Sequence, residues 1–260
     1  MRSLLASAVL ITALAPTGAW AGESACWYEQ GVIVAPASIA GAAGDYILDT
    51  GSPVTVMHET RAQGEGFTEL ARRGAVRVAG LTLPDRPFVV ADLDARTWAF
   101  PTPIAGVIGA DLLAGYVVDV SFNPCRVAIY PLRRAPAFHA VTSLPLEHGA
   151  GVALAQAAVS DGPEALRGRF VVSTGADTAI RLSERLAAVP GAPKPDQILP
   201  YGEARASLRA ASFAGALFEN LDGGLVKEAG SASGVIGAPL LSRWRSLRFD
   251  FARGRLLFGG

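Results

Sequence analysis

The 260-residue chain carries little charge and few of the residues that metal or nucleic-acid chemistry needs. Only 18% of its residues are charged, and Lys plus Arg equals Asp plus Glu at 23 each. This balance of charges does not favour binding to nucleic acid, which requires an excess of positive charge. The histidines, His58, His139 and His148, are scattered, and no Cys-x-x-Cys or His-Glu-x-x-His spacing occurs. We therefore expect no metal, no other cofactor and no nucleic-acid partner.

Long apolar runs are also missing, except for a short one near the N-terminus. The run from Leu4 to Ala15 is shorter than the roughly 20 residues that cross a bilayer. It lies between Arg2 and the AWA of positions 19–21, and this order is typical of a secretory signal. We expect residues 1–21 to be a signal peptide, with secretion across the inner membrane and no stable membrane insertion. Richness in Ala, Gly and Arg favours a bacterial source and the periplasm.

Cysteine is scarce, with only Cys26 and Cys125 in the chain. In the oxidising compartment that a secretory signal implies, an even number of cysteines usually means pairing. We predict a disulfide between them, which would fasten the mature N-terminus to the end of the first half. Two buried free thiols are the alternative.

Apolar residues, in contrast, make up 50% of the chain and fall in short alternating runs. Runs such as AVRVAG, YVVDV and RLLFG have a period of two, which is typical of β-strands. Short helices are expected at 59–72, 111–114, 183–188 and 239–244. The Pro-bearing segment 131–145 lacks a strand pattern, and we place a boundary near Ala135 between domains 22–135 and 136–260. We expect the aromatic side chains of Trp98, Trp244, Phe249 and Phe251 in the core or between the domains, and a cage around a substrate is the alternative.

One short motif occurs twice in the chain. Residues 47–52 read ILDTGS and residues 171–176 read VVSTGA, 124 positions apart. The sequence GVIGA follows about 60 residues after each copy, at 106–110 and at 234–238. Internal repetition of this kind predicts two halves with the same fold.

An Asp-Thr-Gly sequence can carry acid–base chemistry when a strand positions it. Asp49 follows an apolar run, and Gly51 permits a close approach of the backbone. Two carboxylates within about 3 Å cannot both ionise, so that one serves as base and the other as acid, and water is activated without a metal. Alone, the three residues are also a common turn sequence.

The DTGS of residues 49–52, after YIL at 46–48 and with GVIG at 106–109, resembles the aspartic peptidases of the pepsin and retropepsin clan. Residues 173–178, STGADT, resemble the retroviral sequence Asp-Thr-Gly-Ala-Asp-Asp-Thr with serine in the catalytic place. The resemblance implies an all-β protein with short helices and the bilobal acid-protease fold. Two similar β-barrel-like lobes would then face a central cleft that holds an extended polypeptide.

The resemblance also assigns roles to single residues. Asp49 is the first catalytic carboxylate, and Ser173 stands in place of the second. Thr50 and Thr174 are interlocked threonines whose hydroxyls bond to the opposite loop. The other residues that would support the site are Gly51, Ser52, Gly175, Gly109 and Gly237.

Ser173 departs from the clan's pattern at the centre of the mechanism. Its hydroxyl can donate a hydrogen bond to Asp49, but it cannot hold a second negative charge. Asp177, or a homodimer of first lobes, would be another source of a second carboxylate. Two functions follow: an exported aspartic-type endopeptidase that relies on Asp49, and a catalytically inactive peptide-binding pseudoprotease. In both cases we expect a monomer with a polypeptide substrate or ligand.

The flap, the hairpin that covers the substrate in this clan, is expected to differ between the halves. Asp49 is 31 residues from Gly80, whereas Ser173 is 42 residues from Gly215, if these glycines correspond. The first lobe would then lack flap length and the second would keep it. Tyr201-Gly202 is the predicted flap tip, and an ordinary surface loop is the alternative.

Overall fold

The structure is a computed structural model that describes residues 22–149, 151–160, 165–184, 205–227 and 230–260. The predicted signal peptide, the predicted flap tip at Tyr201 and Gly202, and most of the predicted helix at 183–188 lie outside these residues. Within the described ranges, no helix has both the length and the apolar character to span a membrane.

The first half of the chain forms a closed barrel. Its seven strands lie in the spatial order β2 (Trp27–Glu29), β3 (Val32–Ile39), β4 (Ala42–Leu48), β8 (Ile104–Ile108), β5 (Val56–His58), β7 (Leu81–Ala91) and β6 (Ala71–Val78). An additional pairing of β3 with β6 closes six of these strands into a ring.

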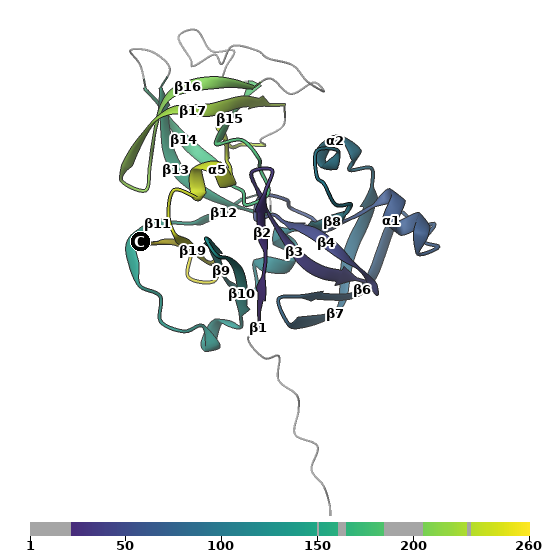
Figure 1. Ribbon diagram of the computed structural model, residues 1–260. Coiled ribbons are helices and arrows are strands. Elements are labelled where there is room, and N and C mark those ends of the chain that lie inside the picture. Colours follow the sequence, from purple (N-terminus) through teal and green to yellow (C-terminus); the bar gives the residue numbers. More distant parts are fainter. Residues whose placement is uncertain (1–21, 150, 161–164, 185–204, 228–229) are drawn as a thin grey trace, which may run out of the picture.

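The second half repeats this arrangement strand for strand. The order is β12 (Glu147–Gly149), β13 (Val152–Ser160), β14 (Ala165–Val172), β18 (Gly234–Ile236), β15 (Ile180–Ser183), β17 (Ala216–Val226) and β16 (Arg205–Phe213). The pairing of β13 with β16 closes this ring as β3 and β6 close the first. Figure 1 shows the two barrels as separate lobes, one in purple and blue and the other in green. The structure thus confirms the predicted all-β fold with two similar lobes.

A third sheet joins the two lobes. Its six strands lie in the order β1 (Gly22–Ala25), β10 (Cys125–Tyr130), β9 (Val117–Phe122), β19 (Ser246–Asp250), β20 (Arg255–Gly259) and β11 (Ala140–Pro145). The first three strands come from one half and the last three from the other, so that β9 and β19 pair at the centre.

Strand β11 corrects the expectation that residues 131–145 contain no strand. It pairs with β20 at the edge of the third sheet, and all of its side chains are exposed or only partly buried. An edge strand of this kind need not alternate apolar and polar residues, because neither face is fully buried. The periodicity of the sequence therefore gave no signal for it.

Short helices connect the strands. α3 (Ala110–Leu113) and α5 (Ala238–Leu241) follow the two GVIG segments directly, close to the predicted positions. α1 (Glu59–Gly64) is shorter than the predicted helix at 59–72, because Gly66 adopts a positive φ of 75° just after it and the chain then enters β6. No sequence pattern predicted α2 (Asp94–Thr97).

Equivalent turns connect the last two strands of each ring. Ala79-Gly80 links β6 to β7 and Ala214-Gly215 links β16 to β17, and all four residues have positive φ. Two-residue turns with positive φ at both positions match the twist of antiparallel strands. Gly80 and Gly215 therefore correspond, as the comparison of flap lengths assumed.

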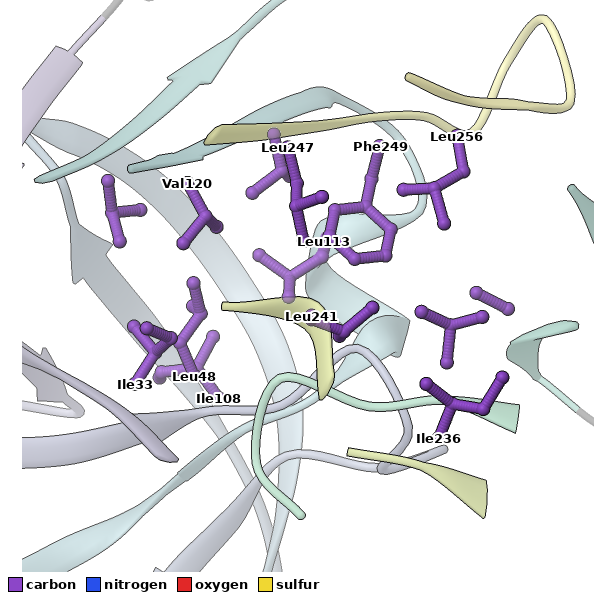
Figure 2. Packing of buried hydrophobic residues seen from close by; sticks show 14 of the residues in the cluster. Ile33, Leu48, Ile108, Leu113, Val120, Ile236, Leu241, Leu247, Phe249 and Leu256 are labelled. Carbon is purple, nitrogen blue, oxygen red and sulfur yellow. The ribbon is translucent and has the colours of Figure 1, made fainter. Parts of the chain in front are cut away.

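One apolar core runs through both lobes and the joining sheet. It contains Leu113 of α3, Leu241 of α5 and Phe249 of β19, and each of these side chains is at most 1% exposed. Figure 2 shows them gathered with neighbours from both halves. Complete burial of such a side chain stabilises the fold by about 2 kcal/mol. The two lobes are thus held together by packing as well as by strand pairing.

Two of the sequence predictions have clear outcomes outside the site. The disulfide is confirmed, because Cys26 and Cys125 are bonded at an S–S distance of 2.04 Å. Trp98, in contrast, is 62% exposed rather than part of the core, since it lies just after the short surface helix α2, and it is one of the residues that line the cavity at the site described below. Phe249 and Phe251 are buried, and Trp244 packs on Phe258 with ring centroids 4.5 Å apart.

Candidate active site

Asp49 and Ser173 occupy equivalent positions at the ends of two strands. Asp49 follows β4, which runs parallel to β8, and Ser173 follows β14, which runs parallel to β18. The Asp49 N–H donates to the Ile108 carbonyl and the Ser173 N–H to the Ile236 carbonyl, each at 2.9 Å. The same strand pairing in each lobe therefore delivers one loop to the space between the lobes.

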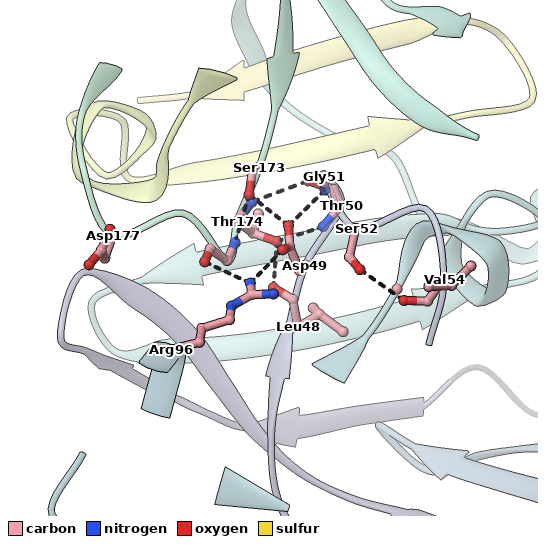
Figure 3. A network of polar contacts seen from close by, with 12 residues as sticks. Leu48, Asp49, Thr50, Gly51, Ser52, Val54, Arg96, Ser173, Thr174 and Asp177 are labelled. Carbon is pink, nitrogen blue, oxygen red and sulfur yellow. Dashed lines mark hydrogen bonds and ion pairs between the residues drawn. The ribbon is translucent and has the colours of Figure 1, made fainter. Parts of the chain in front are cut away.

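The two loops are interlocked by their threonines. The Thr50 hydroxyl donates to the Val172 carbonyl at 2.7 Å, and the Thr174 hydroxyl donates to the Leu48 carbonyl at 2.6 Å. Each threonine N–H also donates to the hydroxyl of the other, at 3.2 Å in both directions. Both threonines are completely buried. Figure 3 shows the loops meeting face to face.

Gly51 and Gly175 allow the close approach of the loops. A Cβ on Gly51 would lie 2.5 Å from the Ser173 Cβ, and one on Gly175 would lie 2.5 Å from the Asp49 Cγ. Contacts this short are sterically forbidden, so any side chain would push the loops apart. Each glycine therefore makes room for the central side chain of the other lobe.

The last glycine of each GVIG sequence and the alanine after it make hydrogen bonds that support the loops. Gly109 donates its N–H to the Thr55 hydroxyl at 3.0 Å, and the next residue, Ala110, donates to the Ser52 carbonyl at 2.7 Å. The Ser52 hydroxyl donates to the Val54 carbonyl at 2.8 Å rather than to Asp49.

The second lobe has the matching contacts. Gly237 donates its N–H to the Ala179 carbonyl at 3.0 Å, and Ala238 donates to the Ala176 carbonyl at 3.0 Å. Ala176 is the counterpart of Ser52, so the two loops are supported at the same point.

Asp49 and Ser173 are in direct contact at the centre. The Ser173 hydroxyl donates to Asp49 Oδ1 at 2.6 Å, and the Gly51 N–H donates to the same oxygen at 2.7 Å. The Gly175 N–H points at Ser173 Oγ at 3.3 Å, as the Gly51 N–H points at the Asp49 carboxylate. Ser173 thus occupies the position in the second lobe that Asp49 occupies in the first, and the two side chains are buried, at 3% and 4% exposure.

A third side chain, which the sequence did not predict, completes the centre. Arg96 of α2 donates from Nη2 to Asp49 Oδ2 at 2.6 Å and to the Gly175 carbonyl at 2.9 Å (Figure 3). It therefore contacts both loops. No motif marks Arg96, which lies 47 residues beyond Asp49 in the chain, and only the return of α2 toward the loops places it there.

These contacts keep Asp49 ionised. Burial has the largest single influence and raises the pKa of the Asp49 carboxyl, because it disfavours the charged form. The Arg96 charge, the hydrogen bonds from Ser173 and Arg96, and the bond from the Gly51 N–H act in the opposite direction. Together they outweigh burial and hold the pKa of Asp49 below its ordinary value.

Asp177 does not take the place of the missing carboxylate. Arg181 donates to Asp177 Oδ1 at 2.5 Å, and the neighbouring Thr178 hydroxyl donates to the same oxygen at 3.1 Å. Figure 3 shows Asp177 well apart from Asp49. Its charge is neutralised by Arg181, away from the centre of the site.

A cavity of about 990 Å³ lies over the two loops. Asp49, Ser173 and Arg96 are among the residues that line it. Its apolar lining comes from both lobes, with Val32, Ile47 and Phe100 on one side and Val152, Val171 and Val235 on the other. The arrangement combines one polar centre with apolar walls, which is typical of ligand sites.

The chain has structural likeness to known proteins but no match in sequence. No protein family model and no curated protein sequence matches it. An aspartic proteinase from Irpex lacteus superposes with a TM-score of 0.54 at 13% identity, over 93% of this chain and 98% of that one. Basic 7S globulin from soybean superposes with a TM-score of 0.50 at 12% identity, over 92% and 94%. The fold is therefore the pepsin-like, bilobal acid-protease fold, and at these identities the likeness extends to the fold alone.

Proposed function

We propose that this protein binds extended polypeptides in the cleft around Asp49 and is a catalytically inactive pseudoprotease. The observation that carries the proposal is the set of partners of the Asp49 carboxylate, which are the Ser173 hydroxyl and the Arg96 guanidinium. A pair of carboxylates that share one proton would need an ionisable group where Ser173 stands.

The contacts of Asp49 argue against general acid–base catalysis. Oδ1 accepts hydrogen bonds from Ser173 and Gly51, and Oδ2 accepts one from Arg96. A carboxylate held in this way is a weaker base, because its pKa is lowered. The Ser173 hydroxyl has far too high a pKa to replace a carboxylic acid as the proton donor.

The cleft itself supports polypeptide binding. Its volume of about 990 Å³ and its apolar walls from both lobes offer space for side chains on either side of a bound strand. Extended polypeptides bind such clefts through main-chain hydrogen bonds, while pockets for alternate side chains give specificity. The cleft is thus suited to bind a polypeptide even without catalysis.

The test combines binding and cleavage on one ligand. Fluorescently labelled, oxidised insulin B chain is titrated with the protein at pH 4 to 7, and binding is followed by anisotropy and cleavage by mass spectrometry. We expect binding without cleavage. We also expect Val235→Trp, which narrows the cleft, to weaken binding at least tenfold, whereas Val141→Trp on exposed β11 leaves it unchanged.

A slow aspartic-type endopeptidase is the second candidate. The retained Asp49, its burial and the interlocked threonines favour it. General acid–base groups contribute about 10² to 10⁴ each, so a site with one carboxylate would be slow at best. Cleavage products that form with the natural protein and vanish with Asp49→Asn would establish this function and refute the inactive one.

A further inference from the structure

Arg96 lines the cleft and contacts the loops of both lobes. Its Nη2 bridges Asp49 of the first lobe and the Gly175 carbonyl of the second, at 2.6 and 2.9 Å. A Cβ on Gly175 would come within 2.7 Å of the same nitrogen, so the guanidinium rests directly on the loop. Any polypeptide that contacts Asp49 has to share this space with Arg96.

The segment that carries Arg96 has the features of a separate cover. We define the cover as residues 92–103, which link β7 to β8 and include α2. The backbone N–H groups of Arg96, Trp98 and Phe100 donate to Leu93, Asp94 and Thr97, all within the cover. α2 buries none of its side chains, and the N–H of its first residue, Asp94, donates to the Asp92 carboxylate, also within the cover. Local bonds and low burial characterise segments that open independently of the rest of a fold.

Both ends of the cover are attached to the first barrel. Leu93 and Phe100 are partly buried against the cluster that contains Val32 and Ile47. The His58 imidazole of β5 lies 3.1 Å from the Asp94 carboxylate. Leu93 and Phe100 would hold the cover on either side of α2, and Asp94 would hold the first residue of the helix, while the part of α2 that carries Arg96 moves.

The Arg96–Asp49 pair stabilises the closed position. The Asp49 side chain is only 6% exposed and that of Arg96 is 34% exposed. A buried carboxylate without a partner is costly, and Arg96 supplies a charge-assisted hydrogen bond to it. In the same cavity, Arg181 is paired with Asp177. The described charges of the cleft therefore form two neutral pairs when Arg96 is in place.

From this geometry we propose that the cover closes the empty cleft through Arg96, and that polypeptide binding requires Arg96 to leave Asp49 and Gly175. The inference rests on the proposed polypeptide-binding function, and it states how access of the polypeptide to the cleft is regulated. A bound strand can donate a main-chain N–H to Asp49 in place of Arg96, while Arg96 moves to solvent. Affinity is then limited by the stability of the closed cover.

The experiment compares the natural protein with Arg96→Gln, Arg96→Lys and a control, Arg77→Gln, at an exposed position on β6. Without ligand, hydrogen–deuterium exchange of residues 92–103 is expected to rise at least fivefold in Arg96→Gln only. With labelled, oxidised insulin B chain, the affinity of Arg96→Gln is expected to rise about tenfold. Arg96→Lys keeps a cation for Asp49 and is expected to stay near the natural protein in both measurements.

The two measurements separate this inference from the proposed function. If the hydrogen–deuterium exchange of residues 92–103 is unchanged in Arg96→Gln, the proposed closure by Arg96 is wrong, whether or not the peptide binds. If exchange increases in Arg96→Gln but its affinity for the peptide is equal to or weaker than that of the natural protein, the proposal is also wrong, because Arg96 would then not obstruct the ligand. Increased exchange with no binding by any variant supports closure by Arg96 and refutes polypeptide binding.

Discussion

Ser173 takes the position in its loop that Asp49 takes in the other loop, and the two loops keep equivalent hydrogen bonds. The Gly175 N–H points at Ser173 Oγ as the Gly51 N–H points at Asp49 Oδ1, and the strand bonds behind both loops are equivalent. The positions of the loops depend on the threonine bonds and the glycine contacts, which do not involve a second carboxylate. Serine at one of the two central positions and aspartate at the other are therefore compatible with the same local fold.

Asp49 is expected to make stability depend on pH. Its pKa is lower in the folded protein, so the ionised carboxylate stabilises the fold above the unfolded pKa of about 3.9, and this contribution is lost as pH falls through the folded value. We expect Asp49→Asn to lower the free energy of unfolding by about 2 kcal/mol at pH 7, as for one hydrogen bond to a charged group. Urea denaturation at pH 7, 5 and 3 measures the difference, which should shrink below about pH 4. A difference that stays constant over this range would contradict the assignment.

The two Thr-Gly loops form one structural element although 124 residues separate them. Each threonine hydroxyl donates to a carbonyl in the opposite strand end and accepts from the opposite N–H. All four of these bonds are buried, so each loop depends on the other for its polar partners.

Removal of one hydroxyl tests this dependence. Thr174→Val keeps the shape but leaves the Leu48 carbonyl and the Thr50 N–H without their partner. We expect a loss of about 2 to 4 kcal/mol in the free energy of unfolding, since each unsatisfied buried group costs about 1 to 3 kcal/mol. Thr102→Val, at an exposed hydroxyl that bonds Asp45 at 3.3 Å, is the matched control. Equal effects of the two substitutions would show that the loops do not depend on this bond.

The joining sheet makes the molecule one unit rather than two lobes on a linker. Arg248 of β19 lies opposite Asp119 of β9, and its Nε and Nη2 donate to the Asp119 carboxylate at 2.6 and 2.7 Å. Its Nη1 donates to the Pro136 carbonyl at 2.7 Å. The guanidinium also lies 4.9 Å from the centre of the Phe138 ring. One buried side chain thus links both halves and the segment between them.

Truncation of Arg248 is expected to destabilise the whole protein. Arg248→Ala leaves Asp119, a largely buried carboxylate, without its partner, and removal of one member of such a pair costs about 3 kcal/mol. Arg255→Ala on β20, whose exposed side chain bonds Ser143, should change the free energy of unfolding by less than about 0.5 kcal/mol. Thermal and urea unfolding of both variants measures this contrast. A similar, small effect for Arg248 would mean that the link between the halves does not depend on this pair.

The sequence by itself predicted a β-rich fold, the repeated halves and the disulfide. Alternating apolar residues mark strands because one face of each is buried, and the repeated motif marks equivalent loops in the two halves. The two cysteines allow a single intramolecular pairing, which the structure confirms. These features are local or covalent, and one chain displays them directly.

Only the tertiary structure decided the rest of the site. Arg96 has no motif, and it reaches Asp49 because α2 turns back over the loops. The edge strand β11 and the exposed Trp98 were also beyond the sequence, since partners elsewhere in the chain or at the surface set their environment. Arg96 contacts loops of both lobes, so its position depends on how the two lobes pack against each other, and periodicity along the chain does not predict that packing.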